Sequence, residues 1–207
     1  MSDALLLLNG PTPNKKLLRA IAKKVDLIAA ADGGLKNALA VDLVPEIVIG
    51  DMDSHPKNLP PLPDTVYLCD FDEDRSDFEK SLAWLKKASY KHVFISGVRG
   101  GRLDHERVNW SVVSAWASKL ELTVIDDGIT RLIGPGRHRF PGGKNRTVSL
   151  VADTPSTTLS TRGLKYPLKK ERLKAGSRGL SNISVGKTYE IEVHAGHVWV
   201  IFPDRSV

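Results

Sequence analysis

The chain has 207 residues, of which 41% are hydrophobic, enough to bury a core in one large domain or two small ones, so fibrous and disordered classes are excluded. Cys69 is the only cysteine, which excludes an intramolecular disulfide and a structural zinc site of the cysteine type. We therefore expect a reducing, cytoplasmic setting. The apolar run from Ala4 to Leu8 is too short for a membrane span or a secretory signal, so no membrane partner is expected.

The net charge of +6 is unevenly distributed along the chain. Residues 1–125 hold 16 Lys and Arg against 17 Asp and Glu, whereas residues 126–207 hold 14 against 7. The basic excess thus belongs to the C-terminal part. Such an excess attracts polyphosphates, RNA or acidic surfaces, and composition alone does not choose among them.

The first 125 residues predict an α/β domain with a Rossmann-like, mostly parallel sheet and flanking helices. Short apolar runs alternate there with segments of helical period. The predicted strands are residues 4–8, 27–31, 46–49, 65–68, 92–96 and 121–125. Phe78, Leu82 and Leu85 recur at helical spacing and predict a helix that Ser76 or Asp77 caps. A second helix is predicted from about residue 104 to 118, and its apolar face is expected to contain Val108, Val112, Ala115 and Trp116.

From about Thr130 onward the pattern changes to period two, interrupted by Gly, Pro and Asn. Residues 147–151, 188–194 and 198–202 are the clearest strands, which predicts a small antiparallel β-sandwich domain. The domains are expected at residues 1–126 and 127–207. The basic stretch from Lys165 to Arg178 is predicted to be a surface loop.

Acidic residues follow the predicted strands repeatedly. Asp32 comes after the second strand and Asp51 and Asp53 after the third, while Asp77 lies at the start of the first clear helix. Ligands of doubly wound sheets bind outside the carboxyl ends of the strands, so these carboxylates should converge. Converging carboxylates repel one another unless a cation lies among them, and Mg²⁺ bound by an Asp-x-Asp pair beside substrate phosphates fits this pattern.

A glycine-rich turn follows the fifth strand, from Gly97 to His105. Its glycines would let backbone N–H groups approach an anion, the following helix start would add a positive dipole end, and Arg102 could bind phosphate oxygens. The turn lacks the Walker spacing and the dinucleotide fingerprint. Together with the acidic residues on the same sheet edge, it suggests nucleotide chemistry.

The spaced set of motifs resembles the thiamin pyrophosphokinase family over nearly the whole chain. The matching segments are Ala31-Asp32-Gly33-Gly34 with Asn37, Gly50 to Ser54, Asp74 to Lys80, Gly97 to His105 with Asn109, Gly163 to Leu168, Ser181-Asn182 and Gly196 to Ile201.

This resemblance implies an enzyme that uses Mg²⁺ to transfer the diphosphate of ATP to the hydroxyl of thiamin. It implies that Asp32, Asp51, Asp53 and Asp77 are catalytic, and that Asp51, Asp53 and Asp77 hold the metal. The residues implied to handle ATP are Asp74, Lys80, Gly100, Gly101, Arg102, Asp104 and Asn109. In the family the active site lies at a dimer interface, and Ser181, Asn182 and Trp199 match positions near the thiamin rings in the β domain of the second subunit. A homodimer with a shared site is therefore expected. For Trp199 the alternative is a place in the sandwich core.

Two other readings remain open. A related diphosphokinase could act on another heterocyclic alcohol, such as a hydroxymethyl pterin, because the phosphate machinery does not define the acceptor. A non-catalytic protein that binds nucleotides or RNA through the basic C-terminal part is the alternative of another class, although its aromatic residues are scattered. We expect no nucleic-acid partner.

Overall fold

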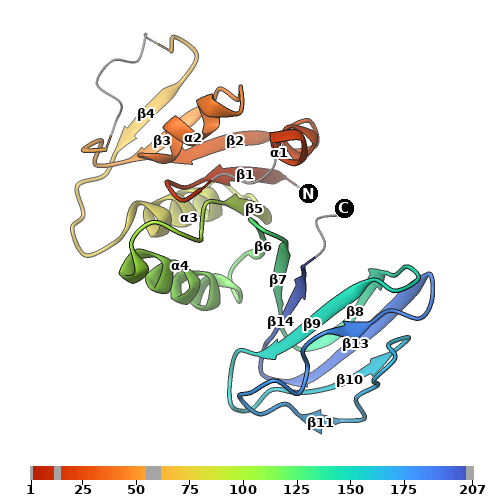
Figure 1. The fold of residues 1–207 in the computed structure, drawn as a ribbon. Coiled ribbons are helices and arrows are strands. Elements are labelled where there is room, and N and C mark those ends of the chain that lie inside the picture. The colour runs from red at the N-terminus through yellow and green to blue at the C-terminus, as the bar shows by residue number, and fades with distance from the viewer. Residues whose placement is uncertain (1, 12–14, 55–61, 204–207) are drawn as a thin grey trace. The chain divides into compact units, whose positions relative to one another are not determined.

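The computed structural model describes residues 2–11, 15–54 and 62–203, and it consists of two compact units, Met1–Asp126 and Asp127–Val207 (Figure 1). The first unit is a parallel sheet with helices and the second is built from antiparallel strands. This architecture confirms the predicted fold class.

Within the described residues of the first unit, six strands form a sheet in the order β6-β5-β1-β2-β3-β4, and every neighbouring pair is parallel. They are β1 (Asp3–Leu7), β2 (Leu27–Ala31), β3 (Ile47–Gly50), β4 (Val66–Cys69), β5 (His92–Ser96) and β6 (Glu121–Ile125). Each lies within one residue of its predicted position. The strand order reverses between β1 and β5, and the carboxyl end of such a switch point is where open α/β sheets bind ligands.

Helices of the described segments cover this sheet, with α1 (Lys15–Ala22) and α2 (Gly34–Ala40) on one side and α3 (Asp77–Lys87) and α4 (Leu103–Trp116) on the other (Figure 1). Leu5 and Leu7 of β1 pack against side chains of α1 and α2 in one buried cluster. The Ser76 side chain accepts a hydrogen bond from the Glu79 N–H at 3.3 Å, so Ser76 caps α3.

The predicted apolar face of α4 is wrong in part, because Val112 is buried and Trp116 is partly buried as expected, but the other two predicted residues are exposed. Val108 is 50% exposed and Ala115 is also exposed, whereas Val112 and Val113 are buried. Compared with the prediction, α4 is rotated about its own axis, because the side chains of Glu106 and Asn109 bind the glycine-rich segment after β5. Glu106, Asn109 and Val113 follow one another at spacings of three and four residues, so they lie on the same face of α4. This face points inward.

Up to residue 203, where the described part ends, the second unit contains eight strands in two layers. They are β7 (Ile129–Ile133), β8 (Gly136–Pro141), β9 (Thr147–Ala152), β10 (Thr158–Arg162), β11 (Glu171–Arg172), β12 (Asn182–Ile183), β13 (Thr188–Ala195) and β14 (Val198–Phe202). One layer has the order β12-β9-β14-β7 and the other β11-β10-β13-β8, and all of these pairs are antiparallel. The alternating residues of both layers meet in one core.

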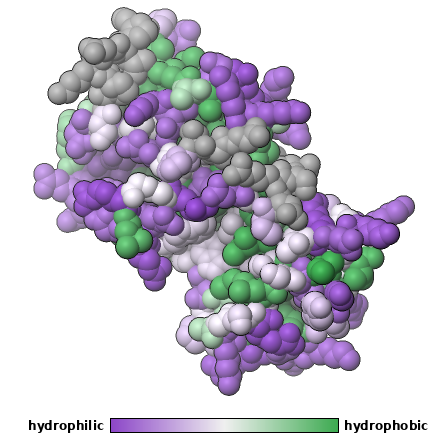
Figure 2. Space-filling model, in the orientation of Figure 1, coloured by the Kyte–Doolittle hydropathy of each residue, from purple (hydrophilic) through white to green (hydrophobic). Residues whose placement is uncertain are grey.

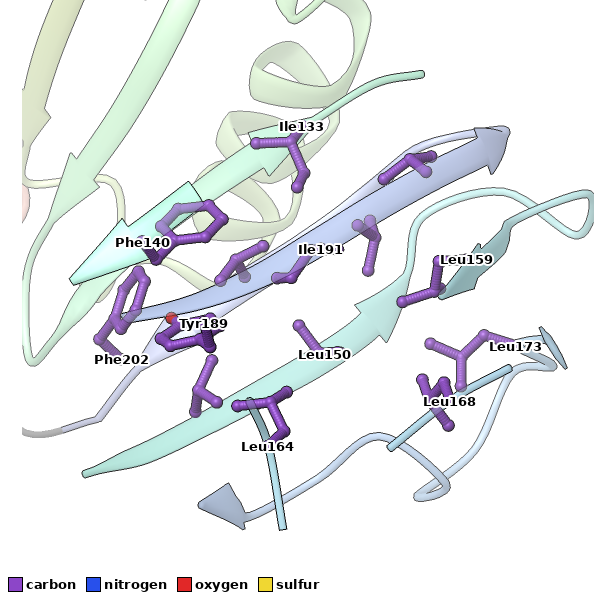
Figure 3. Close-up of a cluster of buried hydrophobic side chains, with 14 residues drawn as sticks. Ile133, Phe140, Leu150, Leu159, Leu164, Leu168, Leu173, Tyr189, Ile191 and Phe202 are labelled. Atoms are coloured by element: carbon purple, nitrogen blue, oxygen red, sulfur yellow. The ribbon is translucent and has the colours of Figure 1, made fainter. Parts of the chain in front are cut away.

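Figure 3 shows this core, with Phe140, Tyr189 and Phe202 grouped toward one end and Leu159, Leu168 and Leu173 toward the other. Leu168 and Leu173 correct the prediction of a plain surface loop at residues 165–178. Both leucines are buried, and β11 pairs with β10. The basic residues between them hide this anchoring in the sequence, because an average over the stretch is hydrophilic.

The surface is mostly hydrophilic on the face that Figure 2 shows, with hydrophobic residues in small groups. Phe71, which is 73% exposed, is one of the few large hydrophobic side chains in contact with solvent. Within the described ranges, no helix is long and apolar enough to cross a membrane.

We predict that Tyr189→Phe leaves the free energy of unfolding unchanged or raises it by about 1 kcal/mol, because a buried polar group without a partner costs stability. The Tyr189 hydroxyl is buried and has no hydrogen-bond partner among the described residues, and burial raises the pKa of this phenol. Chemical denaturation measures the effect. Phe140→Ala, which removes the ring stacked 5.4 Å away, is the control and should cost about 3–5 kcal/mol. A loss of more than about 1 kcal/mol in Tyr189→Phe would contradict the prediction.

Candidate active site

Four aspartates gather at the carboxyl edge of the sheet in the first unit. Asp32 follows β2, Asp51 and Asp53 follow β3, and Asp77 is the first residue of α3. Carboxylate oxygens of Asp32, Asp51 and Asp53 lie within 4.8 Å of one another. All four aspartates line one cavity, as the sequence predicts for residues that follow neighbouring parallel strands.

Asp32 is the most constrained member of this cluster. It is only 2% exposed and has a φ of +31°, and its Oδ2 accepts a hydrogen bond from the Ser54 N–H at 2.8 Å. Its Oδ1 is buried and has no hydrogen-bond partner among the described residues. Burial, together with the negative charge of Asp77, raises the pKa of the Asp32 carboxyl. A buried carboxylate oxygen that faces other carboxylates fits a divalent cation, which would satisfy the oxygen and offset the repulsion.

Gly50, the last residue of β3, allows the cluster to form. A Cβ atom at this position would lie 2.8 Å from the Cβ of Asp32 and 2.9 Å from the Cγ of Asp77. A larger residue would therefore push these two side chains apart. Because Gly50 has no side chain, Asp32, which follows β2, and Asp77, which begins α3, can approach each other.

Lys80 supplies a buried positive charge beside this cluster. Its Nζ lies 3.0 Å from Asp77 Oδ1 and the side chain is 4% exposed. Burial opposes the charged ammonium, but the hydrogen bond to Asp77 keeps the pKa of Lys80 above its ordinary value. Burial also raises the pKa of Asp77, against the effect of Lys80. Asp77, which belongs to the predicted metal set, has Lys80 as its partner, and the group of carboxylate oxygens within 4.8 Å of one another consists of Asp32, Asp51 and Asp53.

The cavity has a volume of about 680 Å³, the size of a pocket for a small molecule. Beyond the four aspartates and Lys80, it is lined by the two turns that follow β1 and β5, including Gly10, Gly97, Gly100, Gly101 and Arg102. These turns meet at the switch point of the sheet. The site therefore joins the acidic cluster to the part of the sheet edge where doubly wound folds bind their ligands.

The glycine-rich turn differs from the predicted anion cradle. The N–H groups of Gly97 and Arg99 donate to the carboxylate of Asp126 at 2.7 and 3.0 Å, and the N–H of Gly100 donates to Glu106 at 2.8 Å. Three backbone donors of the turn are thus already bound by acidic side chains. An anion at this end would therefore meet the residues that follow these three donors, and Gly101 and Arg102 both line the cavity.

The other residues predicted to handle ATP divide into two groups. Asn109 lines the cavity and donates its side-chain N–H to the Val98 carbonyl at 3.1 Å, so it also holds the turn. Asp74 and Asp104 are not among the described residues that line the cavity. Asp104 pairs with Arg102 at 2.6 Å, and this guanidinium lowers the pKa of the Asp104 carboxyl to about 2.

The three residues predicted to contact thiamin belong to the second unit. Asn182 is buried, and its side chain bonds both backbone groups of Tyr166, accepting from the N–H at 3.0 Å and donating to the carbonyl at 2.7 Å. Its amide therefore holds a turn in place. Ser181 is exposed, has a φ of +54°, and donates its N–H to the Ser149 hydroxyl at 3.0 Å.

Trp199 lies on the face of β14 that points away from the core. Its neighbours Val198 and Val200 belong to the core cluster of the second unit, and alternation along a strand places Trp199 on the other face. The indole N–H donates to Asp153 at 2.9 Å, and the ring is partly exposed. The alternative of a tryptophan packed in the sandwich core is therefore wrong.

Sequence reasoning missed several residues of the site, and three of them are informative. Asp126 and Glu106 bind the glycine-rich turn, and Phe71 lines the cavity. Asp126 directly follows β6, so the rule that identifies Asp32 and Asp51 also identifies it. Glu106 carried no such signal, because an acid in the first turn of a helix is common for reasons of helix stability.

A parallel sheet with turns meeting at its switch point, beside carboxylates suited to a divalent cation, is typical of α/β proteins that bind nucleotides. Comparison with known families agrees with this class. Residues 18–125 match the family model "Thiamin pyrophosphokinase, catalytic domain", and residues 137–198 match "Thiamin pyrophosphokinase, vitamin B1 binding domain". The chain belongs to the thiamin pyrophosphokinase family.

Individual relatives are distant in sequence. Thiamine pyrophosphokinase 2 of Arabidopsis thaliana and that of Oryza sativa subsp. japonica are each 25% identical, over 176 and 179 residues. Each match covers 76% of this chain and 65% of the relative, slightly less than two thirds of its length.

Solved structures share the fold. The thiamine pyrophosphokinase of Bacillus subtilis superimposes with a TM-score of 0.85 at 19% identity and full coverage of both chains. That of Geobacillus thermodenitrificans gives a TM-score of 0.84 at 22% identity, covering 100% of this chain and 99% of the other.

We predict that Asp32→Asn stabilises the metal-free protein at neutral pH. The pKa of Asp32 is higher in the folded chain than the ordinary value, so its ionised form destabilises the fold. This cost is absent at acidic pH and grows as the pH rises from the ordinary carboxyl range through the raised pKa. Asparagine keeps an acceptor for the Ser54 N–H and tolerates the positive φ.

Thermal unfolding with EDTA or with MgCl₂, at several pH values, tests this prediction. The variant should gain stability only above the ordinary carboxyl pKa and should lose the stabilisation that MgCl₂ gives the wild type. Asp26→Asn is the control, because Asp26 accepts the Asp3 N–H at 2.9 Å and lies outside the cluster. Lower stability of Asp32→Asn in EDTA at neutral pH would contradict the prediction.

Proposed function

We propose that the protein is a thiamin diphosphokinase, which transfers the β,γ-diphosphate of ATP to the hydroxyl of thiamin and releases AMP and thiamin diphosphate. The observation that carries the proposal is the buried, unpartnered oxygen of Asp32 among three other carboxylates, beside Lys80 and within a cavity of the unit that matches the catalytic domain. The second matching domain supports thiamin as the acceptor.

We assign the metal to Mg²⁺, a hard cation that prefers carboxylate oxygens and usually keeps places for phosphate oxygens. Asp32, Asp51 and Asp53 would hold it, with Asp77 as the fourth acid of the predicted set. When bound, the ion would neutralise negative charge on the phosphate groups. The chain's own side chains supply further positive charge, from Lys80 inside the cavity and Arg102 at its glycine-rich end.

The reaction is an in-line displacement at the β-phosphorus of ATP. The hydroxyl oxygen of thiamin forms a bond to this phosphorus, and the bond from the phosphorus to the oxygen shared with the α-phosphate breaks, so AMP leaves. Asp32 is the candidate that orients the hydroxyl. In a loose transition state the hydroxyl proton can pass late to a phosphate oxygen, so a strong general base is not required. Positioning of the two substrates and stabilisation of the developing charge then supply most of the reduction in the activation barrier.

Incubation of the purified protein with ATP, MgCl₂ and thiamin, followed by mass spectrometry, should yield equal amounts of AMP and thiamin diphosphate. Asp51→Ala/Asp53→Ala should lower the rate by at least about 100-fold, because charge stabilisation of the transferred group is lost. Glu46→Gln, whose carboxylate accepts the Ile28 N–H at 2.7 Å, is the control that should keep full activity. ADP or inorganic phosphate as the product would contradict the diphosphoryl transfer.

The same assay separates the competing functions. AMP formation with a hydroxymethyl pterin but not with thiamin would support the related diphosphokinase. Salt-dependent RNA binding without ATP turnover would support the non-catalytic protein. Two arginines of the second unit are paired, Arg137 with Glu192 at 3.1 Å and Arg178 with Glu171 at 2.8 Å, which makes these two less available to RNA phosphates.

We further propose a homodimer in which the second unit of one subunit binds the thiamin used by the first unit of the other, as the family resemblance implies. The exposed position of Ser181 and the outward face of Trp199 support contact with a ligand, whereas Asn182 acts by holding Tyr166. The exposed, unpaired thiol of Cys69 suits a cytoplasmic location for this activity.

Subunit exchange tests the shared site. Inactive Trp199→Ala and inactive Asp51→Ala should regain activity when mixed, because a mixed dimer contains one site in which both contributing units are unaltered. Mixing Asp51→Ala with Asp53→Ala is the matched control and should regain none, since both changes lie in the same unit. Activity of the first mixture no higher than that of the second would argue against the shared site.

A further inference from the structure

Asp126 is a buried acid at the carboxyl end of β6 to which neither the resemblance nor the proposed reaction gives a task. It is 7% exposed, and burial raises the pKa of its carboxyl. Oδ1 accepts the N–H of Gly97 at 2.7 Å, and Oδ2 accepts the N–H of Arg99 at 3.0 Å. One carboxylate thus binds two nearby amides of the turn that follows β5.

Helix α4 holds the same turn from another direction. Glu106 accepts the N–H of Gly100 at 2.8 Å, and the side chain of Asn109 donates to the carbonyl of Val98 at 3.1 Å. Four consecutive residues, 97–100, are therefore each bound by the side chain of Asp126, directly after β6, or by a side chain of α4. We call Asp126, Glu106 and Asn109 the turn clamp.

The clamped turn interlocks with the turn that follows β1. The N–H of Gly10 donates to the Gly97 carbonyl at 3.2 Å, and a Cβ atom on Gly10 would lie 2.3 Å from that oxygen. Asn37 holds the first turn by donating to the carbonyls of Leu8 at 2.7 Å and Gly10 at 2.6 Å. Both turns line the cavity, so the shape of its wall at the switch point depends on where residues 97–100 are held.

Beyond the clamp, the turn faces open space. A Cβ atom on Gly101 would meet no described atom within 4 Å, and the Arg102 side chain is largely exposed. Both residues line the cavity. Residues 97–100 are held by the turn clamp, and Gly101 and Arg102, which can contact a ligand, come directly after them. The positions of Gly101 and Arg102 therefore depend on where residues 97–100 are held.

We infer that Asp126 is a positioning residue for the nucleotide: by binding the amides of Gly97 and Arg99, it fixes the turn so that Gly101 and Arg102 meet the phosphates of ATP. This inference rests on the proposed function, because it takes ATP as the ligand of the cavity. Asp126 itself lies behind the turn and is not among the residues that line the cavity. Its effect on the nucleotide therefore passes through the backbone.

The test compares Asp126→Ala and Asp126→Asn with the wild type by isothermal titration calorimetry of ATP with MgCl₂, without thiamin. We expect the Kd for ATP to rise about tenfold in Asp126→Ala, as hydrogen bonds to a charged group are lost. Asp126→Asn should show a smaller rise, because its amide keeps one acceptor oxygen. Glu46→Gln is the matched control, a carboxylate bound to a backbone N–H at the opposite edge of the sheet, and its Kd should equal that of the wild type.

Two further readouts separate positioning from a general loss of stability. In steady-state assays the KM for ATP should rise with little change in the KM for thiamin. Hydrogen exchange should be faster at the amides of Gly97 and Arg99, and the Kd and KM for ATP of Asp126→Asn decide the matter if Asp126→Ala fails to fold.

An unchanged Kd and KM for ATP in both variants, with wild-type ATP binding intact, would overturn the inference and leave the proposed function standing. A wild type that binds no ATP would overturn both. Equal rises in the KM for ATP and for thiamin would show that Asp126 only stabilises the fold, and would also overturn the inference.

Discussion

Mutual repulsion of four carboxylates at one edge of a parallel sheet is the constraint around which the first unit is arranged. Gly50 lets Asp32 and Asp77 approach each other, the N–H of Ser54 binds one oxygen of Asp32, and Lys80 offsets the charge of Asp77. These contacts leave the other oxygen of Asp32 buried without a partner among the described residues. The remaining cost is understandable if the site binds a cation together with phosphate groups.

The switch point of the sheet determines where the glycine-rich end of the cavity lies. Because β1 and β5 are neighbours whose connections lead in opposite directions, the turns after them meet and border the same cavity as the aspartates. Acidic side chains, rather than a bound anion, occupy three amides of the turn after β5. The held backbone thus fixes the shape of this end of the cavity, and the side chains of Lys80 and Arg102 supply positive charge for a nucleotide.

Local patterns in the sequence predicted the positions of the strands and the acidic residues of the site. Strand positions follow from apolar runs, and Asp32, Asp51, Asp53 and Asp77 from their places after strands or at a helix start. The orientation of α4 could not be predicted in this way, because Glu106 and Asn109 turn it through contacts with residues close in space. Leu168 and Leu173 were hidden in a basic stretch, and only tertiary packing shows that they are core residues. The face of β14 that carries Trp199 likewise required the core to be known.

The most direct test of the central claim is an anomalous difference map at the manganese edge from crystals grown with MnCl₂ and ATP. Mn²⁺ replaces Mg²⁺ at oxygen sites and can be located without ambiguity. We expect a peak about 2.1 Å from carboxylate oxygens of Asp32, Asp51 or Asp53, with phosphate oxygens completing the coordination of the metal. A map with the nucleotide bound but no peak at these aspartates, or with the metal held only by other residues, would contradict the account.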